Sequence, residues 1–338
     1  MKNLKAEREL ALDFLRVTEA AAIESAKTMG QGDRKHSDHV AVEAMREVMD
    51  SVPMRGRIVI GEGERDEAPM LYIGEEVGGG EFSDDARQGF PEVDIAVDPL
   101  EGTELCAKGL PNAIATIALS ERGTMFDPGP CVYMLKMATS RELAHLLDLD
   151  RAIGDTLQLM AKEKGVAVGD LVVIMLDRER HEDYMREIRD VGARIRLIPH
   201  GDVSAALVAV TQDSPVDLLF GIGGTPEGVL AAAAIQCTGG QILGRLWPRS
   251  DQERDAALEA GYDLDEILDK DRLVSGKDVF FAATGVTDGE MLDGVHYIGP
   301  QGATTESISM RSRSGTVRRI TARHDRTKLR EITGERLG

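Results

Sequence analysis

The chain has 338 residues, which is enough for a large buried core or for two packed lobes that share one site. Its 40 Lys and Arg residues against 59 Asp and Glu residues give a formal net charge of −19, which argues against nucleic-acid and anionic-membrane partners. An anionic protein that binds a phosphate ester needs positive charge at the binding site, either a metal ion or a local group of Arg and Lys side chains.

Cysteine spacing and hydropathy narrow the class of protein further. Cys106, Cys131 and Cys237 lie far apart in the sequence, so neither a zinc site nor a disulfide framework is expected. No apolar run approaches the roughly 20 residues that a membrane-spanning helix needs, so no membrane partner is expected. The charged segment Met1–Leu10 leads into a helical pattern, unlike a signal peptide, so the cytoplasm is the expected location.

Apolar periodicity predicts the elements of the first half in chain order. Apolar residues at steps of three and four predict helices at 6–29 and 39–49. Short apolar runs predict strands at 57–60, 93–97, 113–119 and 132–138. Two of these strands lead into acidic segments, Gly61–Glu64 and Asp98–Thr103.

The second half alternates strands with helices. Strands are predicted at 171–176, 194–198, 216–220 and 279–283, and helices at 182–191, 203–210 and 226–236. This order is typical of a largely parallel sheet. The stretch 306–322, which contains Ser314-Gly315, predicts a β-hairpin. We therefore expect one catalytic unit over residues 1–338, with approximate lobes at 1–150 and 151–338.

Acidic side chains stand at or beside the ends of several predicted elements. They are Asp38 between the two first helices, Glu62 after the strand at 57–60, Asp98 and Glu101 after the strand at 93–97, and Glu227 after the strand at 216–220. Ligands of sheets with parallel strands bind beyond the carboxyl ends of those strands. Carboxylates delivered there can converge on Mg²⁺ or Mn²⁺, and two such ions clamp a phosphate and lower the pKa of a bound water.

The segment Asp98-Pro99-Leu100-Glu101-Gly102-Thr103 meets several criteria of such a site together. Pro99 keeps the chain off the strand ladder, and Gly102 lets the backbone approach a phosphate closely. Thr103 is then placed to hydrogen-bond the attacking water or a phosphate oxygen. The residues of this segment predict a metal-dependent phosphate site.

Glu227, and Asp33, a further acidic residue five positions before Asp38, have a second interpretation. Glu227 follows Thr225 and Pro226, so its carboxylate could serve only the dipole of the helix that begins there. Asp33 follows Gly32, which is typical of a turn.

Tyr133, Arg178 and Arg180 also allow two interpretations. Tyr133 lies in a predicted strand, where tyrosines are usually packing residues. Arg178 and Arg180 stand between a strand and a helix, which suits bidentate phosphate binding but also suits a solvated helix start.

The chain resembles a known family at these motifs. Asp98-Pro99-Leu100-Glu101-Gly102-Thr103 resembles the Asp-Pro-Ile/Leu-Asp/Glu-Gly-Thr/Ser signature of the lithium-sensitive, metal-dependent sugar phosphatase superfamily. The segments Gly61–Gly74 and Gly221–Gly228 are similar to those of the GlpX-type class II fructose-1,6-bisphosphatases, and the similarity extends from Ala11 to about Arg319.

This resemblance implies the fold and the activity. The implied fold is a layered α/β/α/β/α sandwich, with two lobes and mixed sheets. The implied activity is Mg²⁺- or Mn²⁺-dependent hydrolysis of the 1-phosphate of fructose 1,6-bisphosphate, in gluconeogenesis or sugar-phosphate cycling. A homo-oligomer, either a dimer or a tetramer, is implied by the resemblance alone.

The resemblance also implies roles for individual residues. The metal ligands of the family match Asp38, Glu62, Asp98, Glu101 and Glu227. The catalytic set matches Thr103, Asp38 and Glu62, with a carboxylate next to Thr103 accepting a proton. The residues that match substrate-binding positions are Glu101, Gly102, Thr103, Tyr133, Arg178, Arg180, His200, Asp202 and Gly224, of which Tyr133, Arg178 and Arg180 would bind the distal phosphate.

Two positions depart from the family pattern. Arg34 stands where the family commonly has lysine, which retains a cation but changes its reach and its pKa. His200 in Pro199-His200-Gly201-Asp202 replaces an aspartate, which either changes sugar specificity or leaves a loop histidine without substrate contact.

Other functions fit the sequence less well. The nearest alternative is the same reaction on sedoheptulose 1,7-bisphosphate, alone or alongside fructose 1,6-bisphosphate. A covalent aspartyl phosphatase is disfavoured because Asp148-Leu149-Asp150-Arg151 lacks the residue expected after the second aspartate. A dinucleotide-binding dehydrogenase is disfavoured because Pro226 stands where the dinucleotide-binding fingerprint needs a glycine. From another class, a non-catalytic sugar-phosphate sensor is disfavoured because every metal-binding carboxylate is retained.

Overall fold

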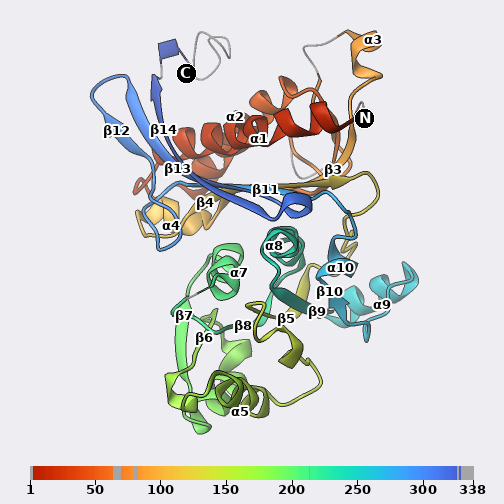
Figure 1. Ribbon diagram of the computed structural model, residues 1–338, viewed down its shortest axis with the longest axis vertical. Coiled ribbons are helices and arrows are strands. Elements are labelled where there is room, and N and C mark those ends of the chain that lie inside the picture. The colour runs from red at the N-terminus through yellow and green to blue at the C-terminus, as the bar shows by residue number, and fades with distance from the viewer. Residues whose placement is uncertain (1–2, 64–69, 80–82, 213, 326, 329–338) are drawn as a thin grey trace. The chain divides into compact units, whose positions relative to one another are not determined.

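The computed structural model describes residues 3–63, 70–79, 83–212, 214–325 and 327–328 (Figure 1). The chain divides into two compact units: unit 1 is Met1–Met125 with Gly276–Gly338, and unit 2 is Phe126–Ser275. These bounds differ from those of the predicted lobes. The reason is that β5 (Tyr133–Thr139) joins the sheet of unit 2, whereas β11 (Phe280–Gly285) and the strands after it join the sheet of unit 1.

Unit 1 is a mixed sheet with helices. In the described residues its sheet has eight strands in the order β12-β13-β11-β4-β3-β1-β2, with β14 paired to β13. The helices are α1 (Asn3–Ala26), α2 (Arg34–Asp50), α3 (Asp84–Arg87) and α4 (Thr103–Lys108), with a 3-10 turn at Ser312–Ser314. The strands are β1 (Arg55–Ile60), β2 (Glu76–Val77), β3 (Glu92–Glu101), β4 (Ile114–Glu121), β11 (Phe280–Gly285), β12 (His296–Ile298), β13 (Gly302–Arg311) and β14 (Thr316–Asp325).

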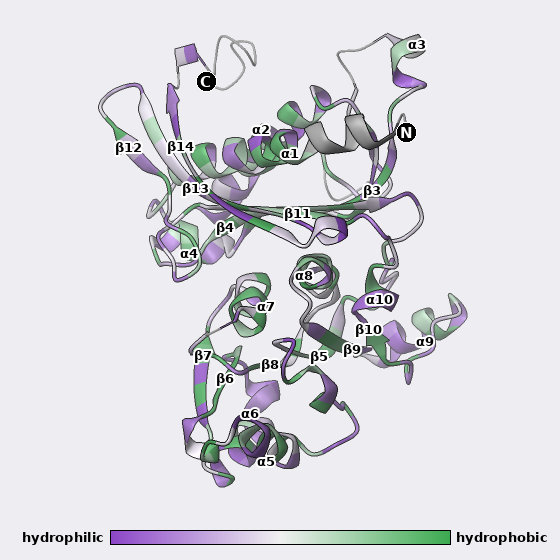
Figure 2. Cartoon of the chain, viewed as in Figure 1, coloured by the Kyte–Doolittle hydropathy of each residue, from purple (hydrophilic) through white to green (hydrophobic). Residues whose placement is uncertain are grey.

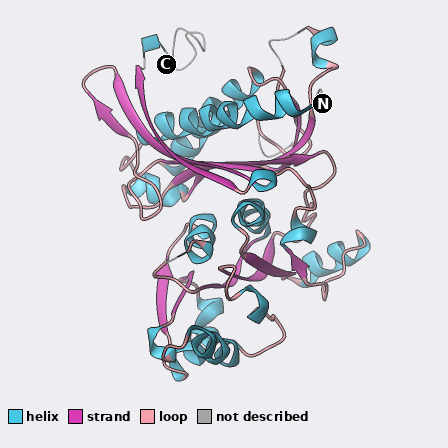
Figure 3. Ribbon diagram, viewed as in Figure 1, coloured by secondary structure: helices cyan, strands magenta, loops and turns pink. Residues whose placement is uncertain are grey.

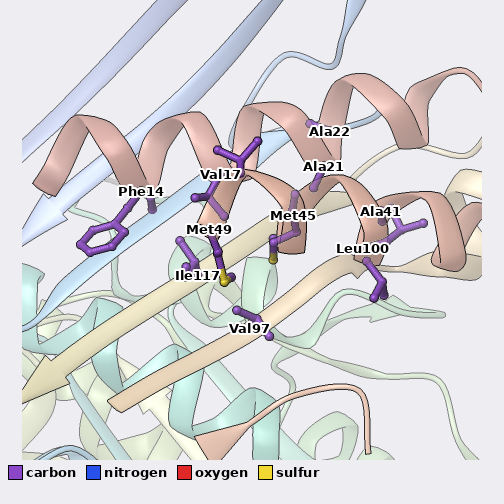
Figure 4. Close-up of a cluster of buried hydrophobic side chains, with 14 of the residues drawn as sticks. Phe14, Val17, Ala21, Ala22, Ala41, Met45, Met49, Val97, Leu100 and Ile117 are labelled. Atoms are coloured by element: carbon purple, nitrogen blue, oxygen red, sulfur yellow. The ribbon is translucent and has the colours of Figure 1, made fainter. Parts of the chain in front are cut away.

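The core of unit 1 lies between the two long helices and the sheet. Figure 1 shows α1 and α2 side by side on one face of this sheet, and Figure 2 shows that both helices carry hydrophobic and hydrophilic residues. The apolar positions recur at steps of three and four, so they share one face of each helix. Figure 4 shows side chains of this face and of the sheet beneath it, all buried: Phe14, Val17, Ala21, Met45 and Met49 from the helices, and Val97, Leu100 and Ile117 from the strands.

Unit 2 is a mixed sheet with helices on both faces (Figure 3). Its sheet has six strands among the described residues, in the order β10-β9-β5-β8-β6-β7. Figure 1 shows α7 and α8 on one face and α5 on the other. The strands are β5 (Tyr133–Thr139), β6 (Val172–Leu176), β7 (Arg194–Ile198), β8 (Leu218–Gly224), β9 (Gln241–Leu246) and β10 (Leu268–Asp269). The helices are α5 (Ile153–Lys164), α6 (Glu182–Asp190), α7 (Asp202–Val210), α8 (Thr225–Thr238), α9 (Asp251–Glu259) and α10 (Lys270–Leu273), with 3-10 turns at Ala144–Leu146, Val168–Asp170 and Glu179–His181.

The predicted α/β fold with two mixed sheets is confirmed, and one detail of the prediction is wrong. The sheet expected to be largely parallel is mixed: β6 pairs in parallel with β7 and β8, whereas β5 pairs antiparallel with β8 and β9. Because β5 comes from before the alternating strands and helices, the pattern of the second half gave no sign of it. The predicted hairpin is present as β13 and β14, which pair antiparallel. In the part of the chain that the structure describes, no helix has the length and apolar character needed to span a membrane.

Candidate active site

Two predicted acidic segments leave neighbouring strands at the same edge of the sheet of unit 1. β1 and β3 pair in parallel, with Ile58 opposite Ile95. Glu62 follows the end of β1 by two residues, and Glu101 is the last residue of β3. Because parallel strands end at the same edge of a sheet, both segments emerge there, as the prediction of a strand-end site requires. The remainder of the acidic segment after β1, residues 64–69, lies outside the described residues.

A β-bulge shapes the segment Asp98–Glu101. The strand was expected to end at Asp98, but β3 continues to Glu101 with a shift of register: Asp98 lies opposite Thr116, and Glu101 lies opposite Ile114. Pro99 fits this position because it has no N–H to contribute to the ladder. Asp98 Oδ1 accepts a hydrogen bond from the Leu100 N–H at 3.2 Å. The bulge lets β3 carry two acidic residues, Asp98 half-buried and Glu101 buried, into the start of α4.

Gly102 makes the turn from β3 into α4. Its φ of 81° and ψ of 43° are left-handed, a conformation that glycine adopts without the steric cost of a Cβ. A Cβ at this position would also lie 2.8 Å from Leu105 Cδ1. Thr103 is therefore the first residue of α4, and its Oγ1 lies 3.0 Å from the carbonyl oxygen of Leu100.

Asp38, Glu62 and Thr103 are brought together in unit 1. The Asp38 carboxylate also accepts a hydrogen bond from Thr103, so the hydroxyl has two acceptors, this carboxylate and the Leu100 carbonyl. Burial raises the pKa of Asp38, against the effects of the Thr103 hydrogen bond and of the positive charge of Arg34. Burial and the nearby charge of Asp38 raise the pKa of Glu62 to about 8.

This pair of carboxylates suits a hard divalent cation. Asp38 and Glu62 repel each other when both are ionised, and a cation between them would remove the penalty. Their donor atoms are carboxylate oxygens, which Mg²⁺ and Mn²⁺ prefer. Within the described residues, no group of three or more His, Cys, Asp or Glu side chains is arranged to hold a metal ion. Joint coordination by all five expected ligands therefore stays a prediction.

The residues around Asp38 have structural roles as well. Asp33 is the N-cap of α2, where its Oδ1 accepts a hydrogen bond from the His36 N–H at 3.0 Å, as expected of a turn residue. Arg34, which departs from the family pattern, forms an ion pair with Glu104 of α4 at 2.9 Å. This ion pair connects the start of the helix that carries Asp38 to the helix that begins with Thr103.

A second charged cluster lies in unit 2, formed by Lys136, Asp202 and Glu227. Lys136, in β5, is 2% exposed, and its Nζ lies 2.5 Å from Asp202 Oδ2 and 2.8 Å from the carbonyl oxygen of Gly224. Asp202 is the first residue of α7, and Glu227 lies in the first turn of α8. Burial raises the pKa of Glu227, while Lys136 opposes this effect and Asp202 adds to it.

Glycines at the end of β8 make room for these carboxylates. A Cβ on Gly223 would lie 2.2 Å from Asp202 Oδ2, and a Cβ on Gly224 would lie 1.7 Å from Glu227 Oε2. Glu227 also accepts a hydrogen bond from its own backbone N–H at the start of α8, as the helix-start interpretation expects. The carboxylate therefore serves the helix start and belongs to a buried charge cluster at the same time.

Sequence reasoning missed Lys136. A usable signal was present, because Lys136 is the one charged residue of the apolar segment Tyr133–Thr139. A lysine is almost never fully buried without a partner, so this position in a predicted core strand indicates a buried carboxylate nearby.

Two of the three expected distal-phosphate residues lie together in unit 2. The guanidinium carbon of Arg180 lies 5.1 Å from the centre of the Tyr133 ring. Arg180 Nε and Nη2 donate hydrogen bonds to the carbonyl oxygen of Ile222, at 3.1 and 2.8 Å. Burial lowers the pKa of Arg180. Arg180 is thus half-buried and anchored, unlike a residue of a solvated helix start.

Arg178 and His200 lie near the start of α7. Arg178 donates a hydrogen bond to the carbonyl oxygen of Pro199 at 2.7 Å, which connects the end of β6 to the turn after β7. His200 is half-buried in that turn, two residues before Asp202. Gly201, between them, has a left-handed φ of 99° that lets the chain turn into α7.

Comparisons with known proteins identify the family of the chain. Residues 8–324 match the family model described as bacterial fructose-1,6-bisphosphatase, glpX-encoded. The chain therefore belongs to this family of sugar-bisphosphate phosphatases.

Individual relatives are similar over nearly the whole chain. Two proteins, from Synechococcus sp. strain JA-3-3Ab and strain JA-2-3B'a(2-13), are each 44% identical over 335 residues, covering 94% of this chain and 96% of theirs. A third, from Synechococcus elongatus, is 44% identical over 337 residues with the same coverage. All three are named D-fructose 1,6-bisphosphatase class 2/sedoheptulose 1,7-bisphosphatase.

The Lys136 cluster gives a prediction about stability. We expect Lys136→Met to lower the free energy of unfolding of unit 2 by about 3 to 5 kcal/mol, because it leaves Asp202 and Glu227 buried without their cation. Adding Asp202→Asn should cost less in this background than in the wild type. Urea denaturation followed by the fluorescence of Trp247, the single tryptophan and a residue of unit 2, measures both effects.

Arg186→Met is the matched control, since it removes one cation of an exposed ion pair with Asp183 in the same unit. Its effect should stay below about 0.5 kcal/mol. A loss for Lys136→Met no larger than that of the control would contradict the buried ion pair.

Proposed function

We propose that the chain hydrolyses the 1-phosphate of fructose 1,6-bisphosphate, giving fructose 6-phosphate and inorganic phosphate. Membership of the glpX-encoded family and the names of the three relatives support this reaction. The observation that carries it is the cluster of Asp38, Glu62 and Thr103 at the edge of the sheet where β1 and β3 end.

Five carboxylates would hold the divalent cations, Mg²⁺ or Mn²⁺. They are Asp38, Glu62, Asp98, Glu101 and Glu227. Bound there, the cations would neutralise charge on the scissile phosphate and lower the pKa of the attacking water. The repulsion between Asp38 and Glu62 supports this assignment, because a protein gains nothing from two such neighbours unless a cation or a proton separates them.

Thr103 and Asp38 would accept and transfer the proton of the attacking water. The Thr103 hydroxyl is hydrogen-bonded to the Asp38 carboxylate and lies 3.0 Å from the Leu100 carbonyl oxygen, and its own oxygen could accept a hydrogen bond from the attacking water. Asp38 is hydrogen-bonded to this hydroxyl and, unlike the Leu100 carbonyl, can take up a full proton. The left-handed turn at Gly102 sets the position of Thr103 at the start of α4.

The family resemblance assigns a further set of residues to the substrate. Tyr133, Arg178 and Arg180 are proposed for the 6-phosphate, and Asp202, His200 and the backbone at Gly224 for the sugar.

Sedoheptulose 1,7-bisphosphate is the second candidate substrate. The names of all three relatives include sedoheptulose 1,7-bisphosphatase. The replacement of a family aspartate by His200, next to the proposed sugar site, is the place where a preference between the two sugars would arise.

Phosphate release from a panel of sugar phosphates, with Mn²⁺, Mg²⁺ or EDTA, tests the proposed reaction. We expect turnover of one or both bisphosphates with either metal, none with EDTA, and none for Asp98→Asn with any metal. The control is Asp94→Asn, in the same strand, because Asn can still accept the hydrogen bonds that Asp94 receives from Thr124 and Met125. Binding of the bisphosphates without any turnover would favour the sensor and contradict the enzyme.

Thr103 can be tested separately by its kinetic effect. We expect Thr103→Ala to lower kcat by roughly 100-fold or more and to leave KM nearly unchanged, because the hydroxyl acts on the proton transfer. Thr103→Ser keeps a hydroxyl and should retain most of the activity. Steady-state kinetics distinguishes the two roles, since a change in KM alone would assign Thr103 to substrate binding.

A further inference from the structure

The ring of Tyr133 has a second arginine over it, which sequence reasoning did not identify. The guanidinium carbon of Arg249 lies 5.2 Å from the ring centre, and that of Arg180 lies 5.1 Å from it. Both distances are typical of cation–π contacts. One aromatic ring thus contacts two guanidinium groups, which come from segments far apart in the sequence.

Strand pairing places Arg249 next to Tyr133. β5 and β9 pair antiparallel, with Met134 opposite Leu246. The pairing continues one residue further, because the Trp247 N–H donates a hydrogen bond to the carbonyl oxygen of Tyr133 at 2.9 Å. Arg249 follows two residues later, just before Ser250 caps the start of α9.

Glu253 of α9 fixes the position of Arg249. Its carboxylate accepts hydrogen bonds from Arg249 Nε and Nη2 at 3.1–3.3 Å and from the Arg249 backbone N–H at 2.5 Å. It also accepts a hydrogen bond from the backbone N–H of Val132, the residue before Tyr133. Burial acts to raise the pKa of Glu253, yet these hydrogen bonds hold it below its ordinary value. One carboxylate thus connects the guanidinium to the strand that carries the ring.

Guanidinium N–H groups that make no hydrogen bond within the described part of the protein indicate an anionic ligand. Arg180 and Arg249 each use Nε and Nη2 within the protein, and among the described residues neither Nη1 has a hydrogen-bond acceptor. Arg178 and Arg180 have no carboxylate within ion-pair distance in the part of the chain that the structure describes, whereas Arg249 has Glu253. The three arginines therefore keep two positive charges without an ion-pair partner, in a protein whose net charge is −19. A phosphate monoester carries about two negative charges at neutral pH.

We propose that Arg249 is a specificity-determining residue, which binds the distal phosphate of the sugar bisphosphate together with Arg180 and Tyr133. This inference rests on the proposed function, which supplies the substrate. The expected set for the distal phosphate is Tyr133, Arg178 and Arg180. The proposal adds Arg249, which comes from another segment and is held in place by Glu253. If Arg249 only supported the Tyr133 ring, Arg249→Met would have no further effect in a Tyr133→Leu background, whereas direct binding of the phosphate by Arg249 predicts a further loss in that background.

A pair of substrates that differ only in the distal phosphate tests the proposal. Arg249→Met should lower kcat/KM for fructose 1,6-bisphosphate by about 10- to 100-fold, the usual effect of losing a charge-assisted hydrogen bond. For fructose 1-phosphate the same variant should stay within about twofold of the wild type, because this substrate has no group for Arg249 to bind. Arg249→Lys should recover part of the loss.

Direct binding gives a readout that does not depend on turnover. The Kd of fructose 6-phosphate, measured by isothermal titration calorimetry, should rise in Arg249→Met by about the same factor. Arg272→Met is the matched control, since Arg272 also lies over an aromatic ring, Phe126 at 5.7 Å, and pairs with a carboxylate of unit 2, Glu266 at 2.7 Å. The two arginines are nearly equally exposed, at 54% and 55%.

The outcomes of these experiments test the role of Arg249 separately from the proposed reaction. Equal losses on both substrates, or an unchanged Kd for fructose 6-phosphate, would overturn the role of Arg249 and leave the proposed reaction standing. If the wild type hydrolyses neither substrate, the proposed reaction fails, and the binding measurement alone decides whether Arg249 recognises a sugar phosphate.

Discussion

Two half-buried carboxylates of like charge, Asp38 and Glu62, lie close together in unit 1 of a protein that is already strongly anionic. Burial and mutual repulsion both oppose their ionised forms. Thr103 and Arg34 relieve part of this cost for Asp38, but Glu62 receives no comparable relief, which is why its pKa rises to about 8. A divalent cation would supply the missing positive charge, and an anionic phosphate ester could then approach.

In the charged cluster of unit 2, the side chain of Lys136 supplies positive charge next to buried carboxylates. Lys136 lies against Asp202 and beside Glu227, so two buried carboxylates have a permanent cation. Burying this ion pair costs desolvation free energy for both Lys136 and Asp202. What the pair contributes is a fixed position for the carboxylates. The glycines at the end of β8 leave the space that these carboxylates occupy. Lys136 thus supplies positive charge within the cluster of unit 2, whereas the pair of Asp38 and Glu62 in unit 1 would depend on the proposed metal ion.

Much of the local structure follows from the sequence, because apolar periodicity and turn residues are local signals. The five predicted helices and most of the central strands are present near their predicted positions, and the parallel pairing of β1 and β3 brings their acidic ends to one edge. The helices α3, α4, α5, α9 and α10 were not predicted, and α2 begins at Arg34, so Asp38 lies within this helix and not before it. The partners of β5 could not be predicted, since long-range pairing leaves no mark on a single apolar run. The bulge that extends β3 to Glu101 was missed for a related reason: a proline after an apolar run signals a strand end as strongly as it signals a bulge.

The site was predictable where it depends on motifs and was missed where it depends on packing. Asp98 and Glu101 belong to a short recognisable segment. Lys136 stands alone in an apolar strand, and its partners come from helices that begin about 65 and 90 residues later in the chain. Arg249 has no local signal at all, because its role depends on the pairing of β9 with β5 and on Glu253 one helical turn later.

Binding of Mn²⁺ to the purified protein, followed through the electron paramagnetic resonance signal of the free ion, tests most directly whether the carboxylates of unit 1 hold a metal. The wild type should remove Mn²⁺ from solution stoichiometrically. The isosteric double variant Asp38→Asn/Glu62→Gln should bind the ion far more weakly while its circular dichroism spectrum stays unchanged. Equal Mn²⁺ binding by the two proteins, or none by either, would contradict the metal site.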